Sequence, residues 1–180
     1  KIEETRVELP GEEKAEAPVD LEALAAEEEA AGEVAEQLAE AEVFQPLGMQ
    51  STGYVWPRQD EYRLTNAHGR STTQGHEFTR AFAAFSLHTT AGDYARFIAE
   101  TMRSEIGEAL LAPQVQIDQS LAWGLGWGLA GHVFWHWGDM DDFQCVAVAS
   151  RAEGRGLVCL TNSEHGLGAC VEILSRALGS

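Results

Sequence analysis

Residues 132–161 read HVFWHWGDMDDFQCVAVASRAEGRGLVCLT, and this stretch decides the fold. It contains three short runs rich in β-branched and aromatic residues, at 132–137, 143–150 and 156–161, each bounded by glycine or charged residues. Such runs are typical of β-strands. The AEGRG segment at 152–156 is short enough to join the last two runs as a hairpin, so the sequence predicts an antiparallel sheet.

The segments on either side extend this sheet and cover it. Residues 121–129 form another short β-rich run, and residues 167–178 have helical periodicity. The face of this last helix that we expect to be buried carries leucine and valine, at Leu167, Val171, Leu174 and Leu178. The predicted fold class is therefore α+β, with a meandering antiparallel β-sheet flanked by helices.

A helix is also predicted from about Ala91 to Arg103. Thr90 and Asp93 have the spacing of a capping box, in which each side chain accepts a hydrogen bond from an exposed backbone N–H. A second, shorter helix is predicted around residues 106–111, ending before Pro113.

The N-terminal part divides into a lead-in and a helix. Residues 1–20 have no periodicity and are predicted to be loosely attached. A helix is expected from Leu21 to about Val43, with Asp20 as its N-cap. We expect Gly32 to interrupt this helix. We expect residues 45–48 (QPLG) to end it, because proline disfavours helical geometry at the preceding residue. Residues 50–80 are predicted to be a long connection over the surface.

The net charge of −17 is concentrated at the N-terminus. Residues 1–42 carry 15 acidic and 3 basic side chains, a net charge of −12, which leaves −5 for the remaining residues. The glutamates of the predicted helix are expected to form a solvated face. Nucleic acids and anionic lipid surfaces would repel this charge, so we expect neither as a partner, and no apolar run approaches the ~20 residues of a membrane span.

The three cysteines, Cys145, Cys159 and Cys170, have no metal-ligand spacing. We expect buried free thiols and not a disulfide framework, and we expect no cofactor. The first residues of the chain lack the apolar stretch of a secretory signal, which favours a cytoplasmic location for the chain as given.

Five segments, in order, resemble the serine β-lactamase and penicillin-binding-protein-like hydrolases, in particular the class C and esterase branch. They are VFQPLGMQST (43–52), LHTTAGDYARF (87–97), WGLGWGL (123–129), FWHWGD (134–139) and LVCLTN (157–162). The resemblance implies that residues 33–180 are the C-terminal part of such a domain. Residues 1–32 show no match and are predicted to be a separate acidic segment.

The same resemblance implies where an active site would lie. His136-Trp137-Gly138 occupies the place of the family's third catalytic box, written KTG, HTG or HGG in different branches. His136 is the catalytic candidate, and Trp137, Gly138 and Asp139 are the substrate-binding candidates. By analogy, the backbone N–H of Asp139 would belong to an oxyanion hole. The alternative for His136 is a histidine packed among the aromatic residues of its strand.

The family's other two boxes do not occur in this sequence. Ser-x-x-Lys supplies the nucleophile and a neighbouring amine. The two lysines here, Lys1 and Lys14, have no serine three residues before them, and none of the three tyrosines begins Tyr-x-Asn. The chain is thus expected to be the C-terminal portion of a hydrolase of esters or amides, and to be inactive unless the missing half is supplied.

Other patterns give weaker hypotheses. No metal-ligand spacing supports a site among His132, His136, Asp139, Asp141 and Asp142, so no metal is expected. Ser163 and His165 are read as a helix-capping turn. The alternative to the hydrolase fragment is a non-catalytic binding or assembly module whose acidic helix meets a partner protein, and an uncovered half-domain would also be prone to self-association.

Overall fold

The computed structural model describes residues 21–55, 80–140 and 143–178. Within them lies a six-stranded antiparallel sheet in which each strand pairs with the next one in sequence. The strands are β1 (Val115–Gln116), β2 (Leu121–Trp123), β3 (Gly128–Ala130), β4 (Val133–Met140), β5 (Phe143–Ser150) and β6 (Arg155–Thr161). The predicted α+β class, an antiparallel sheet flanked by helices, is confirmed.

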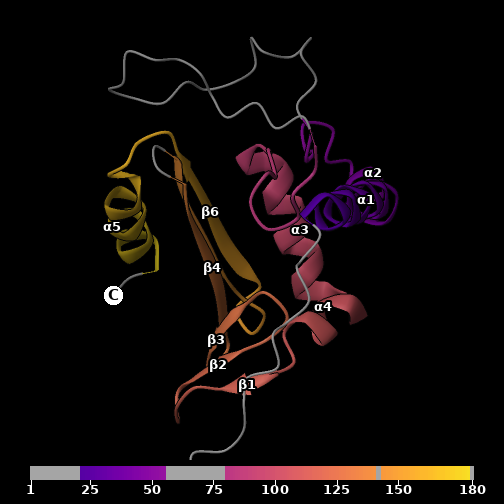
Figure 1. Cartoon of the computed structure of the whole chain (residues 1–180). Helices are drawn as coiled ribbons and strands as arrows, with labels where there is room; N and C mark the ends of the chain where they lie inside the picture. Colours follow the sequence, from indigo (N-terminus) through magenta and orange to yellow (C-terminus); the bar gives the residue numbers. More distant parts are fainter. Residues whose placement is uncertain (1–20, 56–79, 141–142, 179–180) are drawn as a thin grey trace, which may run out of the picture.

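Helices cover the two faces of the sheet. Helix α3 (Ala91–Arg103) packs on β5 and β6 from one side, and α5 (Gly166–Leu178) packs on them from the other, as Figure 1 shows. Because side chains alternate along a strand, each face has its own set of residues. We call them the α3 face, which includes Phe134 and Ala147, and the α5 face, which includes Gln144 and Cys159.

The core lies on the α3 face. Its buried cluster joins the helix to the sheet and consists of Ile98, Trp127, Phe134, Ala147 and Ala149. Burial of one large apolar side chain contributes ~1.5–3 kcal/mol to the free energy of unfolding, so Ile98, Trp127 and Phe134 contribute most of the stability of this cluster. The two alanines leave room for the rings of Trp127 and Phe134, which meet edge to face with centroids 5.0 Å apart.

The N-terminal helix runs through the glycine that was expected to interrupt it. Helix α1 (Leu21–Ala39) is continuous at Gly32, so that prediction is wrong. Gly32 is buried, and a Cβ atom there would overlap the carbonyl oxygen of Ala81. The glycine thus allows the helix to approach the backbone of the segment at residue 81. The N-cap predicted at Asp20 lies outside the described residues.

The helical segment ends within residues 45–48, as predicted, although Pro46 itself still lies in a helical turn. A π-helical turn, η1 (Glu40–Phe44), follows α1, and α2 (Gln45–Leu47) carries the proline before the segment ends at Gly48. Proline lacks an N–H and its ring clashes with the carbonyl four residues earlier in a regular helix. The wider turn just before Pro46 accommodates both constraints. Most of the connection predicted over 50–80 lies outside the described residues.

Helix α3 begins as the sequence predicts. The hydroxyl of Thr90 accepts a hydrogen bond from the N–H of Asp93 at 3.2 Å. The carboxylate of Asp93 bonds to a different segment of the chain. It accepts hydrogen bonds from the N–H of Ser51 at 2.7 Å and from the hydroxyl of Thr52 at 3.2 Å. It thereby ties α3 to the segment after α2. Helix α4 (Glu105–Leu110) follows, close to the predicted position.

The strand predicted over 121–129 is divided in two. The structure has β2 and β3 in its place, joined by a tight turn in which the N–H of Gly124 donates to the carbonyl of Trp127 at 2.8 Å. Gly126 adopts a φ of 80°, which residues with a Cβ rarely tolerate. The prediction of one strand was wrong because it treated the two glycines as strand residues.

Helix α5 is confirmed, and Leu167 and Leu174 of its predicted buried face are half-buried, but Val171 is not buried. Val171 is 54% exposed, whereas Cys170 is fully buried. Position 170 lies three residues after Leu167 and four before Leu174, so it shares their face of the helix. No helix in the described ranges is both long enough and apolar enough to cross a membrane.

Candidate active site

The four predicted site residues lie where β4 extends beyond its neighbour. Strand β4 pairs with β5 along its whole length, from Val133 to Met140. Strand β3 pairs with β4 only as far as Trp135. In the part of the chain that the structure describes, the β3-side edge of residues 136–140 therefore has no neighbouring strand. Backbone groups along such an edge can pair with a ligand or with another chain segment.

His136 stands on the α3 face against two indole rings. The ring centroids of Trp123 and Trp127 lie 6.1 Å and 6.3 Å from that of the imidazole, and both contacts are edge-on, at 77° and 89°. The imidazole remains exposed to solvent, while Trp127 is only 4% exposed. The histidine thus combines an aromatic wall with an open side on which a ligand can approach.

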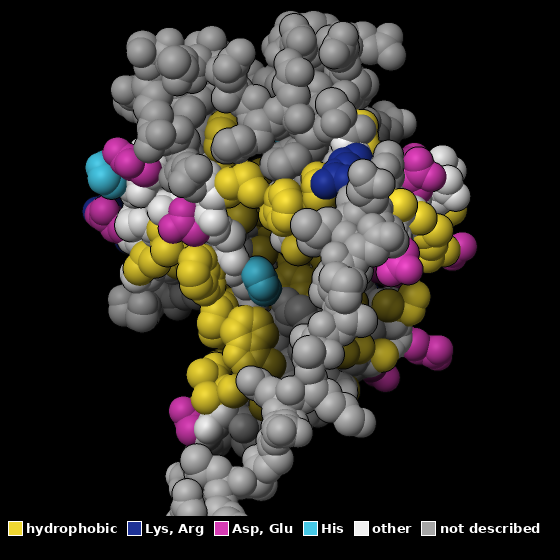
Figure 2. Space-filling model, in the orientation of Figure 1, with side chains coloured by type: hydrophobic (Ala, Val, Ile, Leu, Met, Phe, Trp, Pro, Cys, Tyr) yellow, Lys and Arg dark blue, Asp and Glu magenta, His cyan; other side chains and the backbone are white. Residues whose placement is uncertain are grey.

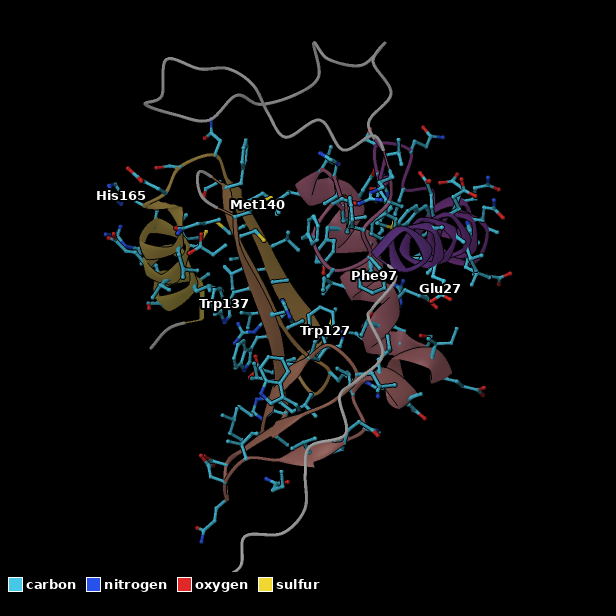
Figure 3. All side chains as sticks on the ribbon, viewed as in Figure 1. Glu27, Phe97, Trp127, Trp137, Met140 and His165 are labelled. Atoms are coloured by element: carbon cyan, nitrogen blue, oxygen red, sulfur yellow. The ribbon has the colours of Figure 1, made fainter. Side chains whose placement is uncertain are left out.

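Trp127 holds this wall in place from the interior. Its ring stacks on Phe97 of α3, with centroids 6.3 Å apart, and meets Phe134 of β4 on another side. Figure 3 shows Phe97 and Trp127 reaching towards each other across the space between helix and sheet. In Figure 2 hydrophobic side chains gather along the middle of the molecule, around an exposed histidine. The wall beside His136 is therefore fixed by the same rings that form the core.

Trp137 and Asp139 point away from His136. They alternate with it along β4, so their side chains lie on the α5 face, where Trp137 is 48% exposed (Figure 3). The Asp139 carboxylate accepts from the side-chain amide N–H of Gln144 at 3.0 Å, and Oε1 of the same Gln144 side chain accepts from the N–H of Leu167 in α5 at 2.7 Å. The side chain of Asp139 is thus engaged in holding α5. At the open edge of β4, therefore, only the backbone of Asp139 is available to a ligand.

Gly138 lies beside a half-buried thiol. A Cβ atom at this position would be 2.9 Å from the sulfur of Cys145 on β5. Any larger residue would push against that side chain, so the packing of β4 on β5 is itself a reason for the glycine. Burial raises the pKa of the Cys145 thiol, which keeps it protonated and weakly nucleophilic.

A tyrosine near this thiol was missed at the level of sequence. Tyr94 of α3 packs against Phe97, with ring centroids 5.6 Å apart. Burial raises the pKa of Tyr94 to about 12, and Cys145 and Tyr54 add to the shift. These three residues come from different parts of the chain. No local pattern could have grouped them.

The weaker constellations have structural roles in the described residues. The hydroxyl of Ser163 accepts from the N–H of His165 at 3.3 Å, in the turn that begins α5, and His132 approaches Glu153 at 3.4 Å across the hairpin end. Within the described ranges no three His, Cys, Asp or Glu side chains are grouped to hold a metal ion. Asp141 and Asp142 lie outside those ranges.

The Beta-lactamase family model matches residues 20–178, and the chain belongs to this family. The match begins at residue 20. The predicted division between residues 32 and 33 stays a prediction.

Solved structures share the fold at low sequence identity. A class C beta-lactamase matches with a TM-score of 0.68 and 14% identity, over 85% of this chain and 54% of that chain. The octameric penicillin-binding protein homologue from Pyrococcus abyssi has a TM-score of 0.62 and 16% identity, over 81% and 38%. A beta-lactamase/D-alanine carboxypeptidase from Yersinia pestis, complexed with citrate, has 0.59 and 17%, over 74% and 44%. This chain thus spans about half the length of these structures or less.

No curated protein matches the chain.

Proposed function

We propose that this chain forms one wall of the active site of an acyl-serine hydrolase, and that it hydrolyses neither esters nor amides by itself. The observation that carries the proposal is the open edge of β4 at residues 136–140, with His136 exposed at its start beside Trp123 and Trp127. A substrate carbonyl or carboxylate can lie along this edge and meet both the imidazole and the backbone N–H groups.

Each group would have a separate task. The imidazole of His136 can donate a hydrogen bond to a carboxylate or take part in proton transfer, since one ring nitrogen carries a hydrogen and the other can accept one. The N–H of Asp139 would stabilise negative charge on the substrate oxygen. One such donor contributes ~10²–10³ in rate, and in an acyl-serine enzyme the second donor is the N–H of the nucleophile itself.

The serines with described hydroxyl bonds support the second half of the proposal. Six of them are engaged within their own turn or helix, with partners that are backbone groups or an aspartate, namely Ser86, Ser104, Ser120, Ser150, Ser163 and Ser175. The aspartate is Asp118, and hydrogen bonds from Ser120 hold its pKa below the usual value, which makes it a weak base. A nucleophilic serine needs a base that can take its proton.

The test is the behaviour of the purified chain towards acylating reagents. We expect no turnover of nitrocefin or p-nitrophenyl acetate above buffer, and no mass increase after treatment with a fluorophosphonate or a penicillin. Turnover that one serine-to-alanine substitution abolishes would refute the proposed inactivity.

Complementation tests the proposed role of the wall. The chain would be co-expressed with the N-terminal part of a class C β-lactamase that carries Ser-x-x-Lys and Tyr-x-Asn. In a complex that acylates, His136→Ala should lower kcat/KM at least ~10²-fold. His132→Ala is the matched control, because this imidazole lies at the turn before β4, 58% exposed and paired with Glu153. Equal effects of the two substitutions would remove His136 from the proposal.

The assembly-module hypothesis has one observation in its favour. Val34 and Leu38 lie one turn apart on α1 and are 56% and 58% exposed, on a helix rich in glutamate. Light scattering, measured as a function of salt concentration, distinguishes self-association from the binding of a basic partner. Self-association through the apolar pair persists at high salt and is lost in Leu38→Glu, whereas binding of a basic partner by the glutamates weakens as salt screens the charges.

A further inference from the structure

Two cysteines meet between the sheet and the C-terminal helix. The sulfur atoms of Cys159 on β6 and Cys170 on α5 are 2.6 Å apart. Nonbonded carbon atoms rest at ~3.5–4.0 Å, and sulfur is larger than carbon. Disulfide sulfurs lie about 2.05 Å apart, so a small movement separates this contact from a covalent bond.

We propose that Cys159 and Cys170 form an intramolecular disulfide that fastens α5 to β6. Cys170 is fully buried and Cys159 is partly buried. The start of α5 is anchored independently, because the N–H of Leu167 donates to Gln144 of β5 at 2.7 Å. The folded chain therefore holds the two thiols together before any oxidation takes place.

Cys145, the third thiol, faces the other way. Its residue pairs with Leu160 on the α3 face, whereas Cys159 pairs with Val146 on the α5 face. A Cβ built on Gly138, also on the α3 face, would touch the Cys145 sulfur. Cys145 is thus an internal control of similar burial, on the opposite side of the same sheet.

The exposure of the two thiols sets the order of steps. Burial raises the pKa of Cys170 to about 12, and the neighbouring Cys159 adds to this, so its thiolate is scarce near neutral pH. The Cys159 thiolate attacks a low-molecular-weight disulfide such as glutathione disulfide, expels one glutathione and forms a mixed disulfide. Cys170 then gives up its proton and attacks the Cys159 sulfur, which expels the second glutathione. Two protein thiols lose two protons and two electrons, and one glutathione disulfide is reduced to two thiols.

Peptide mapping detects this bond directly. The full chain is equilibrated with mixtures of glutathione and its disulfide, quenched with acid and alkylated. Trypsin leaves both cysteines in one peptide, residues 156–176, and cleavage after Glu164 separates them. We expect this tryptic peptide to carry no alkyl group and to be lighter by about 2 Da than the unalkylated dithiol peptide, because two hydrogens are lost on oxidation. After cleavage at Glu164 its two pieces should stay joined until a reductant is added.

Cysteine variants and the unfolded chain test whether the fold itself favours the disulfide between Cys159 and Cys170. Cys145→Ser should leave the linkage unchanged, while Cys170→Ser should stop at a glutathione adduct on Cys159. The folded chain should form the bond at a ratio of glutathione disulfide to glutathione ~tenfold or more below that required in guanidinium chloride. Equal ratios in the folded and unfolded chain, or a lasting glutathione adduct on Cys159 in the wild type, would overturn the proposal.

Discussion

The substitution Phe134→Ala tests the core and the site wall together. Phe134 is 2% exposed, lies on the same face of β4 as His136, and packs edge to face on Trp127 with ring centroids 5.0 Å apart. Trp127 in turn forms part of the wall beside His136. Loss of the Phe134 ring leaves an unfilled volume directly behind that wall.

The expected cost follows from the neighbours of the ring. Truncation of a buried phenylalanine to alanine lowers the free energy of unfolding by ~3–5 kcal/mol, and the loss is greatest where the site cannot collapse. Ala147 and Ala149 have no side-chain rotamers with which to fill the space, and Trp127 is held by Phe97. We therefore expect about 4–5 kcal/mol, of which ~0.5–1.5 kcal/mol is the edge-to-face contact.

Urea unfolding followed by tryptophan fluorescence measures this loss. With an m-value of ~2 kcal/mol/M, the midpoint should fall by about 2 M. Phe85→Ala is the matched control, because it removes the same atoms from a ring that is 48% exposed, and it should cost less than half as much. A loss below ~1.5 kcal/mol for Phe134→Ala, or equal losses in the two variants, would refute the packing argument.

Three further predictions concern other contacts. Gly128→Ala places a Cβ 2.6 Å from the ring of Trp135 and should cost ~1–3 kcal/mol in urea unfolding, whereas Gly168→Ala, with nothing within 4 Å, should be neutral or slightly stabilising. The pKa of Tyr94 is raised to about 12 in the folded chain, so the folded state retains a proton that the unfolded state loses near pH 10. Stability should thus be unaffected by this group below pH 10 and fall between pH 10 and 12, and the absorbance of tyrosinate should show a late titration that is absent in Tyr94→Phe. Asp93→Ala should cost ~3 kcal/mol or more in thermal unfolding, because a buried carboxylate with several donors is lost, and Asp93→Asn should recover part of it; a loss under 1 kcal/mol would contradict the role of this residue as a tie between segments.

Local sequence patterns predicted a helix or strand well wherever the conformation of a residue is set by its neighbours in sequence. Alternation and turn glycines placed β4, β5 and β6, and the Thr90 cap placed the first residue of α3. The errors occurred at Gly32 and at the glycine pair of the β2–β3 turn. At Gly32 the reason is a distant backbone, the carbonyl of Ala81, which no local rule contains.

The site was predicted only in part, because its environment is assembled from several elements. Because side chains alternate along a strand, a strand at residues 132–137 is sufficient to put Phe134 and His136 on one face. The alternation could not reveal that Trp127 would lie between them and Phe97, or that Asp139 would be tied to Gln144. These contacts depend on the register of strands and on how α3 and α5 pack, which are properties of the whole fold.

Strand β4 therefore serves two layers at once. Its open edge and His136 belong to the proposed site on the α3 face, while the Asp139 carboxylate reaches through Gln144 to the N–H of Leu167 at the start of α5. Three residues further along the same helix, Cys170 touches Cys159. The position of α5 is thus linked by hydrogen bonds to the residue whose N–H would face the substrate. A disulfide between the two thiols would hold the same turn of α5. The side chain of Gln144 therefore connects this helix, on the α5 face, to the strand that carries the proposed site.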